Sequence, residues 1–154
     1  MKPYADTNLF TRLYLQLPET ARALEWIEHA RRRGSAAIPV TWLHRMEFVN
    51  AVQQHVFAGL AGQRRVTSEQ AAIALMSFRE DLSRGEFLYS SPIDLHELEQ
   101  QFEELSLRHT AKYGFRTYDL LHVASALLLK CDTFWSFDPK ASKLAGLEGL
   151  KIRR

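Results

Sequence analysis

The sequence predicts an α/β protein in which helices cover both faces of a central, mostly parallel sheet. Short apolar segments of strand length alternate with longer segments of helical periodicity, and this alternation is typical of parallel strands joined by crossover helices. With 154 residues, 46% of them hydrophobic, the chain is long enough to bury one core and too short to bury two. We therefore expect one three-layer α/β/α domain over residues 1–154.

The first third of the chain contains two predicted strands and two predicted helices. They are a strand at 2–6, helices at 9–17 and 19–33, and a strand at 36–40. Pro18 stops the first helix, since the residue before a proline disfavours the helical conformation. Ala23, Trp26 and Ala30 recur at helical spacing in the second helix, and Gly34 follows as its stop.

Two long helices are predicted next, separated by a loop. Thr41 is placed to cap a helix over 42–58 with a regular apolar face. The two glycines and two arginines within 59–66 predict a loop. Thr67 and Gln70 resemble a capping box that opens a helix over 68–83.

The last part of the chain repeats the alternation. A strand is predicted at 87–90, helices at 94–112 and 117–130, a strand at 133–137 and a small helix, and the segment 150–152 completes the fold. Asp94 and Thr117 begin the two longer helices, and Asp138 follows the apolar strand.

Composition bounds the functional class. Cys131 is the only cysteine, which excludes an internal disulfide and a thiolate zinc site and suits a reducing cytoplasm. No run of about 18 apolar residues occurs, and the segment before Asp6 has no apolar signal-peptide core. We therefore expect a cytoplasmic protein with no membrane contact.

The overall charge does not indicate a nucleic-acid partner, because 20 Lys and Arg nearly balance 18 Asp and Glu. Four local basic clusters contain residues that could meet phosphates: Arg31, Arg32 and Arg33; Arg64 and Arg65; Lys140 and Lys143; and Lys151, Arg153 and Arg154. Each cluster is equally explained as a solvated helix end or tail, where cations are favoured by the helix dipole.

Four acidic residues stand at the ends or beginnings of predicted elements. Asp6 ends the first strand, Glu47 lies in the helix after the second strand, Asp119 opens a helix, and Asp138 follows the strand at 133–137. A parallel sheet brings such positions to the carboxyl edge of its strands. Crowded carboxylates repel unless a divalent cation compensates them, so the pattern predicts a site for Mg²⁺ or Mn²⁺.

Each acid also has a purely structural explanation. Asp6 and Asp138 are suitable helix caps, Asp119 is a favourable charge in a first helical turn, and a helical residue such as Glu47 is usually solvated. What favours the metal site is the joint pattern, because independent caps have no reason to meet at one sheet edge.

The same residues resemble the four motifs of PIN-domain nucleases. The resemblance lies in Tyr4-Ala5-Asp6-Thr7-Asn8, in Glu47 after Thr41-Trp42-Leu43, in the segment from Tyr118 to Ala126, and in Phe134-Trp135-Ser136-Phe137-Asp138. It covers essentially the whole chain and is closest to single-domain ribonucleases of the VapC type, the toxins of toxin–antitoxin pairs.

The resemblance implies a Mg²⁺- or Mn²⁺-dependent endoribonuclease. Asp6, Glu47, Asp119 and Asp138 would hold one or two cations, and a metal-bound water would attack RNA. Thr7, Asn8 and Ser136 match polar positions beside the acids and would orient them through hydrogen bonds. The implied partners are RNA, a cognate antitoxin and a second copy of the chain in a homodimer. The segment between the second and third acids is longer than in the shortest toxins of this type.

Other motifs are absent or ambiguous. The six histidines form no HExxH pair, and neither a phosphate-binding glycine loop nor a serine nucleophile elbow occurs. His122, three residues after Asp119, could approach a phosphate, but a packed structural histidine explains it as well. The aromatic residues are expected to fill the core or an interface.

Two other functions stay open at this stage. A non-catalytic PIN-like module that binds RNA or a protein would keep the fold without the reaction, although such a module gains nothing from four uncompensated carboxylates. A Mg²⁺-dependent phosphoesterase acting on small esters or DNA flaps is a third reading, weakened by the absence of a DxDxT opening.

Overall fold

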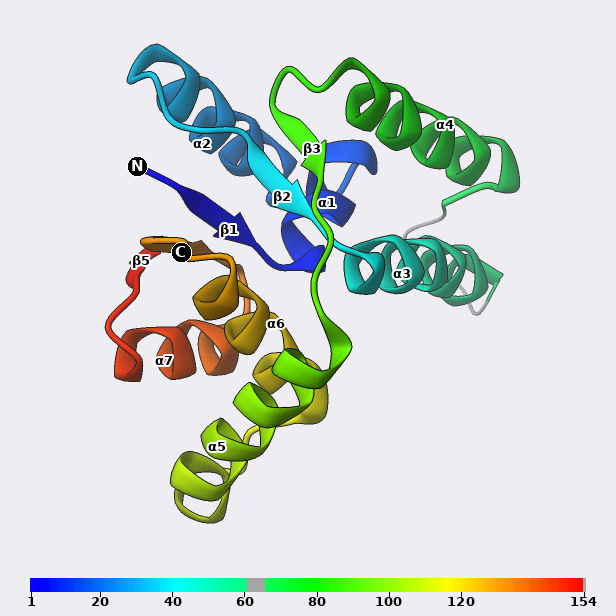
Figure 1. The fold of residues 1–154 in the computed structure, drawn as a ribbon. Coiled ribbons are helices and arrows are strands. Elements are labelled where there is room, and N and C mark those ends of the chain that lie inside the picture. Colours follow the sequence, from blue (N-terminus) through cyan, green and yellow to red (C-terminus); the bar gives the residue numbers. More distant parts are fainter. Residues whose placement is uncertain (61–65, 154) are drawn as a thin grey trace.

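The computed structural model describes residues 1–60 and 66–153 (Figure 1). Its elements, in chain order, are β1 (Pro3–Ala5), α1 (Thr7–Tyr14), α2 (Thr20–Arg32), β2 (Ile38–Val40), α3 (Trp42–Leu60), α4 (Ser68–Arg84), β3 (Leu88–Ser90), α5 (Leu95–Tyr113), α6 (Thr117–Leu128), β4 (Thr133–Trp135), α7 (Pro139–Leu147) and β5 (Lys151–Arg153).

The central strands pair in parallel. β1 pairs with β4, and β4 pairs with β5. β2 pairs with β3 and lies against β1 without joining its hydrogen-bonded ladder. The predicted mixed α/β fold with a central parallel sheet is confirmed.

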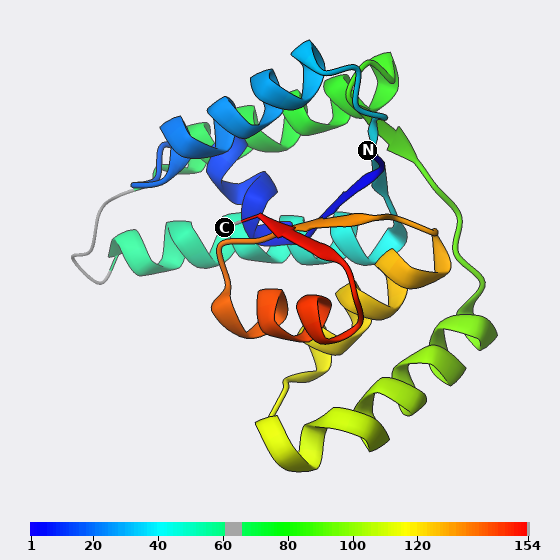
Figure 2. The same ribbon diagram turned by 90° about the vertical axis from the view of Figure 1, so that its left-hand side faces the viewer.

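Neighbouring residues of β1 and β4 face opposite sides of the sheet, as the two-residue period of a strand requires. Tyr4 is opposite Phe134 in the register, and Ala5 is opposite Trp135. Tyr4 and Phe134 belong to one apolar cluster, while Ala5 and Trp135 belong to another. Figure 2 shows the strands between α2 and α4 on one side and α6 and α7 on the other.

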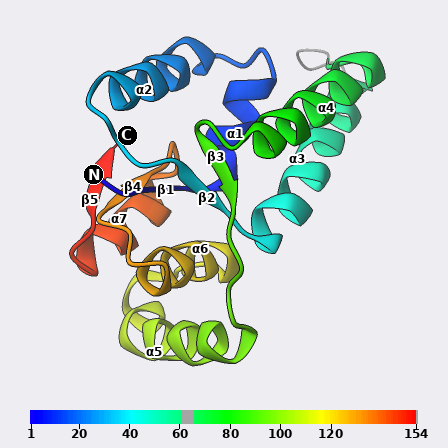
Figure 3. The ribbon, with the colours of Figure 1, turned by 45° about the horizontal axis from the view of Figure 1, so that its top comes forward.

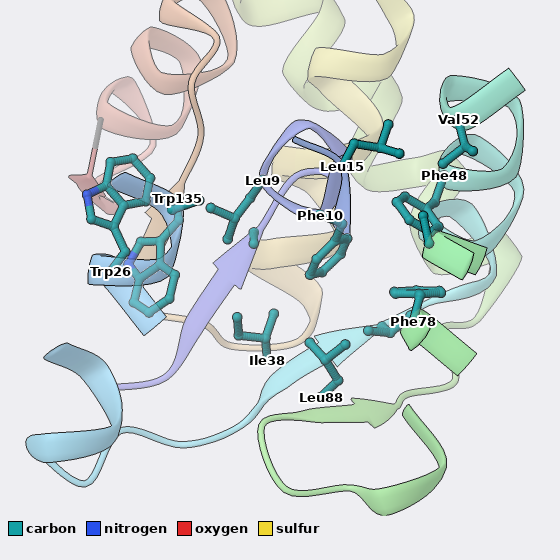
Figure 4. Packing of buried hydrophobic residues seen from close by; sticks show 14 of the residues in the cluster. Leu9, Phe10, Leu15, Trp26, Ile38, Phe48, Val52, Phe78, Leu88 and Trp135 are labelled. Carbon is teal, nitrogen blue, oxygen red and sulfur yellow. The ribbon is translucent and has the colours of Figure 1, made fainter. Parts of the chain in front are cut away.

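The first apolar cluster joins α1 to α4 with β2, β3 and one face of β1 and β4. Figure 4 shows its larger members, and aromatic contacts hold its centre together. Phe78 of α4 packs 4.6 Å from Phe48 of α3 and 5.7 Å from Phe10 of α1, measured between ring centroids. Because three helices meet there, this cluster fixes α3, which carries Glu47.

The second cluster packs α5, α6 and α7 against the other face. Helix α6 is the centre of this layer, since it contacts both α5 and α7. Figure 3 shows α5 beyond α6, so α5 is the outermost element of the layer. The long segment between the second and third acids is thus filled by α4, β3 and α5.

Several predicted boundaries are confirmed, and others move by a few residues. Thr67 and Gln70 form the predicted capping box. Helix α1 begins at Thr7 and ends at Tyr14, earlier than the predicted 9–17. Pro18 has no N–H for the carbonyl of Tyr14 and crowds it, and the Thr20 hydroxyl donates to the carbonyl of Leu15 (2.8 Å).

The predicted loop at 59–66 lies only partly within the described residues. Its first two residues belong to α3, and residues 61–65 lie outside the described residues, as do the basic cluster of Arg64 and Arg65 and the terminal Arg154. None of the helices in the described part of the chain is both long and apolar enough to cross a bilayer.

Candidate functional site

The four predicted acids line one cavity. Asp6 directly follows β1, Asp138 lies three residues after β4, and these two strands are parallel neighbours. Glu47 comes from α3 and Asp119 from the first turn of α6. The cavity has a volume of about 270 Å³ and is lined by Asp6, Thr7, Asn8, Glu47, Arg116, Tyr118, Asp119, His122, Asp138 and Ala141.

Asp6 is the most deeply buried of the four acids, with 4% of its surface exposed. Its Oδ2 accepts hydrogen bonds from Asn8 Nδ2 (2.6 Å) and Ser136 Oγ (2.5 Å). Its Oδ1 is buried and has no hydrogen-bond partner among the described residues. Burial raises the pKa of Asp6 to about 7, although the charge of His122 and the Ser136 hydrogen bond act to lower it.

Ser136 and Asn8 form the polar support of this carboxylate. Ser136 Oγ accepts the backbone N–H of Asp138 (2.8 Å), and Asn8 Oδ1 accepts the backbone N–H of Phe137 (2.9 Å). The turn after β4 is therefore tied to the residues after β1. Both side chains also donate hydrogen bonds to Asp6.

Glu47 is held by two donors instead of facing solvent. Its Oε2 accepts from Thr7 Oγ1 (2.5 Å) and lies 2.6 Å from His122 Nε2. Burial acts to raise the pKa of Glu47, but the hydrogen bond and charge of His122, together with Thr7, outweigh it and lower the pKa. His122 Nδ1 lies 3.0 Å from the Tyr4 hydroxyl, so this buried histidine links β1, α6 and α3.

His44, one helical turn before Glu47, ties α3 to β1. Its Nδ1 accepts the backbone N–H of Thr41 (3.0 Å), so its Nε2 carries the proton and donates to the carbonyl of Ala5 (2.8 Å). The Thr41 hydroxyl, predicted to cap α3, lies 3.1 Å from the same Nδ1. Burial lowers the pKa of His44 well below its ordinary value, which keeps the ring neutral. The bond to Ala5 fixes Glu47 relative to Asp6.

Asp119 and Asp138 share one cation, Arg116. Asp119 Oδ1 accepts from Arg116 Nη2 (3.1 Å), and its Oδ2 accepts from Nε (3.2 Å) and from the backbone N–H of Arg116 (3.0 Å). Asp138 Oδ2 lies 2.5 Å from the same Nη2. The hydrogen bonds to the two carboxylates raise the pKa of Arg116 above its ordinary value.

The structure shows which of the four acids have the structural roles that the sequence also allowed. Asp6 makes no side-chain cap bond to α1, so capping does not explain it. Glu47 is not a solvated surface residue, because its side chain is only 26% exposed. Asp138 does cap α7, since its Oδ1 accepts from Lys140 N (2.7 Å). Asp119 reaches back to the N–H that precedes α6, as a residue at the third helical position often does.

The donor set fits a hard cation, although the arrangement seen here is not a closed cage. All four acids offer carboxylate oxygens, the ligands that Mg²⁺ and Mn²⁺ prefer. Among the described residues, Asp6 Oδ1 has no hydrogen-bond donor and is available to a cation. Within residues 1–60 and 66–153, no three His, Cys, Asp or Glu side chains converge closely enough to hold a metal ion. Side chains of the protein engage the other three carboxylates instead.

The sequence matches the family model described as "PIN domain" over residues 4–147. The chain belongs to the PIN domain family. The matched range includes all four acids and every element from β1 to α7, except the first residue of β1. A comparison with curated protein sequences gives no significant match.

Solved structures confirm the PIN fold at low sequence identity. A chain of "VapBC2 from Rickettsia felis bound to a DNA fragment from their promoter" superposes with a TM-score of 0.67 and 15% identity, covering 99% of this chain and 98% of that one. A toxin–antitoxin complex from Klebsiella pneumoniae superposes with a TM-score of 0.56 and 17% identity, covering 99% of this chain and 96% of that one. FitAcB from Neisseria gonorrhoeae superposes with a TM-score of 0.54 and 12% identity, covering 99% of this chain and 96% of that one.

Sequence reasoning missed Arg116 and His44. Arg116 precedes Asp119 by three residues, the spacing at which side chains meet across one helical turn, so this signal was present in the sequence. His44 could not be found from local pattern, because its partner Ala5 lies 39 residues away. His122, left open between a phosphate contact and a packed residue, is buried and bound to Glu47.

Proposed function

We propose that this PIN domain protein is a Mg²⁺- or Mn²⁺-dependent endoribonuclease that acts through one domain over residues 1–154. The observation that carries the proposal is the meeting of four carboxylates from separate elements at one cavity, with a buried oxygen of Asp6 left without a partner. A buried carboxylate with a free oxygen is costly unless a cation binds it.

The chain's own residues have distinct roles in the proposed reaction. Asn8 and Ser136 orient the carboxylate of Asp6, while Thr7 and His122 orient that of Glu47. Asp6, Glu47, Asp119 and Asp138 would hold the cation. When bound, the cation supplies a lowered pKa for an attacking water and stabilisation of the leaving oxygen.

A polymeric substrate is favoured over a small phosphate ester. Beside the acid cavity lies a larger hollow of about 860 Å³ between α3 and α6, and Glu47 and Tyr118 line both. A small ester would occupy the acid cavity alone, whereas a nucleic-acid strand extends beyond the reacting phosphate. This continuity supports a nucleic-acid strand as the substrate.

The proposed partners are an antitoxin and a second copy of the chain. The structures quoted above include toxin–antitoxin complexes, which supports a toxin role here and a protein partner that would neutralise it. The homodimer is supported by apolar side chains exposed on α3, of which Phe57 is 68% exposed and Met46 66%. The single buried Cys131 supports a reducing cytoplasmic location.

One observation favours the non-catalytic alternative. Arg116 already compensates Asp119 and Asp138, so half of the acid pocket is neutralised by the protein itself. A PIN-like binding module would be stable in this form without a cation. The two functions differ in whether a cation binds and whether RNA is then cut.

The test is cleavage of a structured RNA, a matched DNA and p-nitrophenyl phosphate with Mg²⁺, Mn²⁺ or EDTA. We expect only RNA to be cut, only with cation, and Asp6→Asn to reduce the rate at least about 100-fold, because it removes a ligand charge at nearly constant shape. Asp94→Asn is the matched control, since Asp94 caps α5 outside the cavity and Asn caps equally well.

Other outcomes have defined meanings. Wild-type activity in Asp6→Asn would contradict the proposed metal site. Cation binding without cleavage of any RNA offered, including total cellular RNA, would favour the binding module. A partner encoded in a short reading frame adjacent to this one would be expected to co-purify with the chain and to suppress cleavage.

A further inference from the structure

Among the described residues that line the acid cavity, Arg116 is the only lysine or arginine, and the proposed reaction leaves it without a role. Its guanidinium makes two hydrogen bonds to Asp119, at 3.1 and 3.2 Å, and a further contact to Asp138 at 2.5 Å. It therefore occupies the oxygens of two of the four acids that would hold a cation.

The three partners differ sharply in exposure. The side chain of Arg116 is 62% exposed, whereas that of Asp119 is 6% exposed and that of Asp138 is 26% exposed. The acids are thus fixed in the cavity wall, while the guanidinium reaches them from solvent. Because the guanidinium is exposed, it can withdraw into solvent without being buried elsewhere when a divalent cation takes its place beside the two acids.

The charge balance of the pocket gives the displaced guanidinium a second use. One divalent cation offsets two of the four formal negative charges, and an approaching phosphodiester adds another negative charge. Arg116 offsets a third carboxylate while staying at the cavity wall. Its planar fork of donors also matches a phosphate group as well as it matches a carboxylate.

We propose that Arg116 is a built-in counter-ion, which competes with the divalent cation for Asp119 and Asp138 and, once displaced, binds a phosphate of the nucleic-acid strand. The inference rests on the proposed metal-dependent function. It assigns a substrate-binding role to a residue that belongs to none of the four acidic motifs.

The experiment compares wild type with Arg116→Gln, which keeps a polar side chain and leaves the backbone N–H free to bond Asp119. Mn²⁺ affinity is measured by isothermal titration calorimetry. Affinity for a fluorescent single-stranded RNA is measured by anisotropy with Ca²⁺, and RNA integrity is checked on a gel. Arg84→Gln is the matched control, because Arg84 is exposed and pairs with Glu80 on α4.

We expect Arg116→Gln to bind Mn²⁺ about 10-fold more tightly and RNA about 10-fold more weakly than wild type, each equivalent to about 1.4 kcal/mol. Arg84→Gln should change both constants by less than about 2-fold, since surface charges at a distance are screened. Arg116→Lys keeps the charge but loses the fork, so it should lie between wild type and Arg116→Gln in both measurements.

The failures are distinguishable. If wild type binds no Mn²⁺, the proposed metal site itself is wrong. If wild type and Arg116→Gln bind Mn²⁺ equally, only the competition is wrong, and if RNA affinity is equal in both, Arg116 does not bind the phosphate. Thermal unfolding followed by circular dichroism confirms that the variants are folded, and Arg116→Lys answers the same questions if Arg116→Gln is not.

Discussion

At the scale of single residues, Asp6 is where stability and function oppose each other. The fold buries this carboxylate and leaves one of its oxygens without a donor. Burial disfavours the ionised form of this group, and this is the reason its pKa is raised to about 7.

The raised pKa predicts how stability depends on pH in EDTA. Between the ordinary value of 3.8 and about 7, the folded state holds a proton on Asp6 that the unfolded state has lost. The free energy of unfolding therefore falls as pH rises through this window. Each pH unit is worth about 1.4 kcal/mol, which gives an upper bound of about 4 kcal/mol.

Asp6→Asn removes this titrating group and should flatten the decrease between pH 4 and pH 7. The measurement is urea denaturation of wild type and variant at a series of pH values in EDTA. Adding Mn²⁺ at pH 7 should stabilise wild type more than the variant. Parallel pH profiles for the two proteins would show that burial of Asp6 does not govern stability.

Prediction from sequence works where the signal is local and fails where a residue acts through a distant partner. Asp6 and Asp138 are visible because each follows an apolar strand, and the parallel sheet then brings them together without any knowledge of side-chain contacts. Arg116 stands at helical spacing from Asp119, whereas His44 and His122 act through partners far along the chain and through burial. Neither quantity is encoded in local pattern.

At the scale of elements, Asp138 belongs to two structures at once. Its Oδ1 caps α7 through the N–H groups of Lys140 (2.7 Å) and Ala141 (3.4 Å), with Pro139 in the first turn. Its Oδ2 faces Arg116 in the cavity. The sequence offered helix capping and a place in the acid cavity as alternatives for Asp138. The carboxylate does both, because one oxygen caps α7 and the other faces the cavity.

Two substitutions at this position separate the roles. Asp138→Asn keeps a capping oxygen, whereas Asp138→Ala removes it, so the alanine variant should unfold about 1 kcal/mol more easily than the asparagine variant. Both should weaken Mn²⁺ binding, since both remove the charge. Chemical denaturation in EDTA and Mn²⁺ calorimetry give the two readouts. Wild-type Mn²⁺ affinity in Asp138→Asn would restrict this residue to capping.

Element boundaries follow sequence signals where the capping partner is local. The capping box of α4 lies within four residues, and it was predicted with the correct register. The end of α1 depends on the Thr20 hydroxyl, which bonds the carbonyl of Leu15 and accepts the N–H of Leu17 (3.0 Å). Pro18 marks a stop in the sequence, but the Thr20 contacts beyond the helix end cannot be read from local pattern.

At the scale of the whole molecule, the sheet divides the chain into two packed halves that meet at the acid cavity. The first apolar cluster fixes α3 and its Glu47, and the second fixes α6 and its Asp119. The polar bonds of His44 and His122 then cross between these halves through β1. The position of the four acids thus depends on both cores.

The outer surface of α3 carries apolar side chains that packing within one chain does not bury. Met46, Val49 and Phe57 project from this helix with exposures of 66%, 41% and 68%, and their spacing places them on one side of it. An apolar face of this kind is expected to be covered by another protein surface. A second copy of the chain is the occupant we propose.

If that dimer forms, wild type should elute at twice the 17.8 kDa mass of one chain in size-exclusion chromatography with light scattering. Phe57→Glu should raise the dimer dissociation constant at least about 10-fold, because a charge would be buried in an apolar contact. Leu107→Glu is the matched control, since Leu107 is 79% exposed on α5 and lies away from this face. A monomeric wild type, or an equal effect of both substitutions, would contradict an interface on α3 and leave this face to the antitoxin.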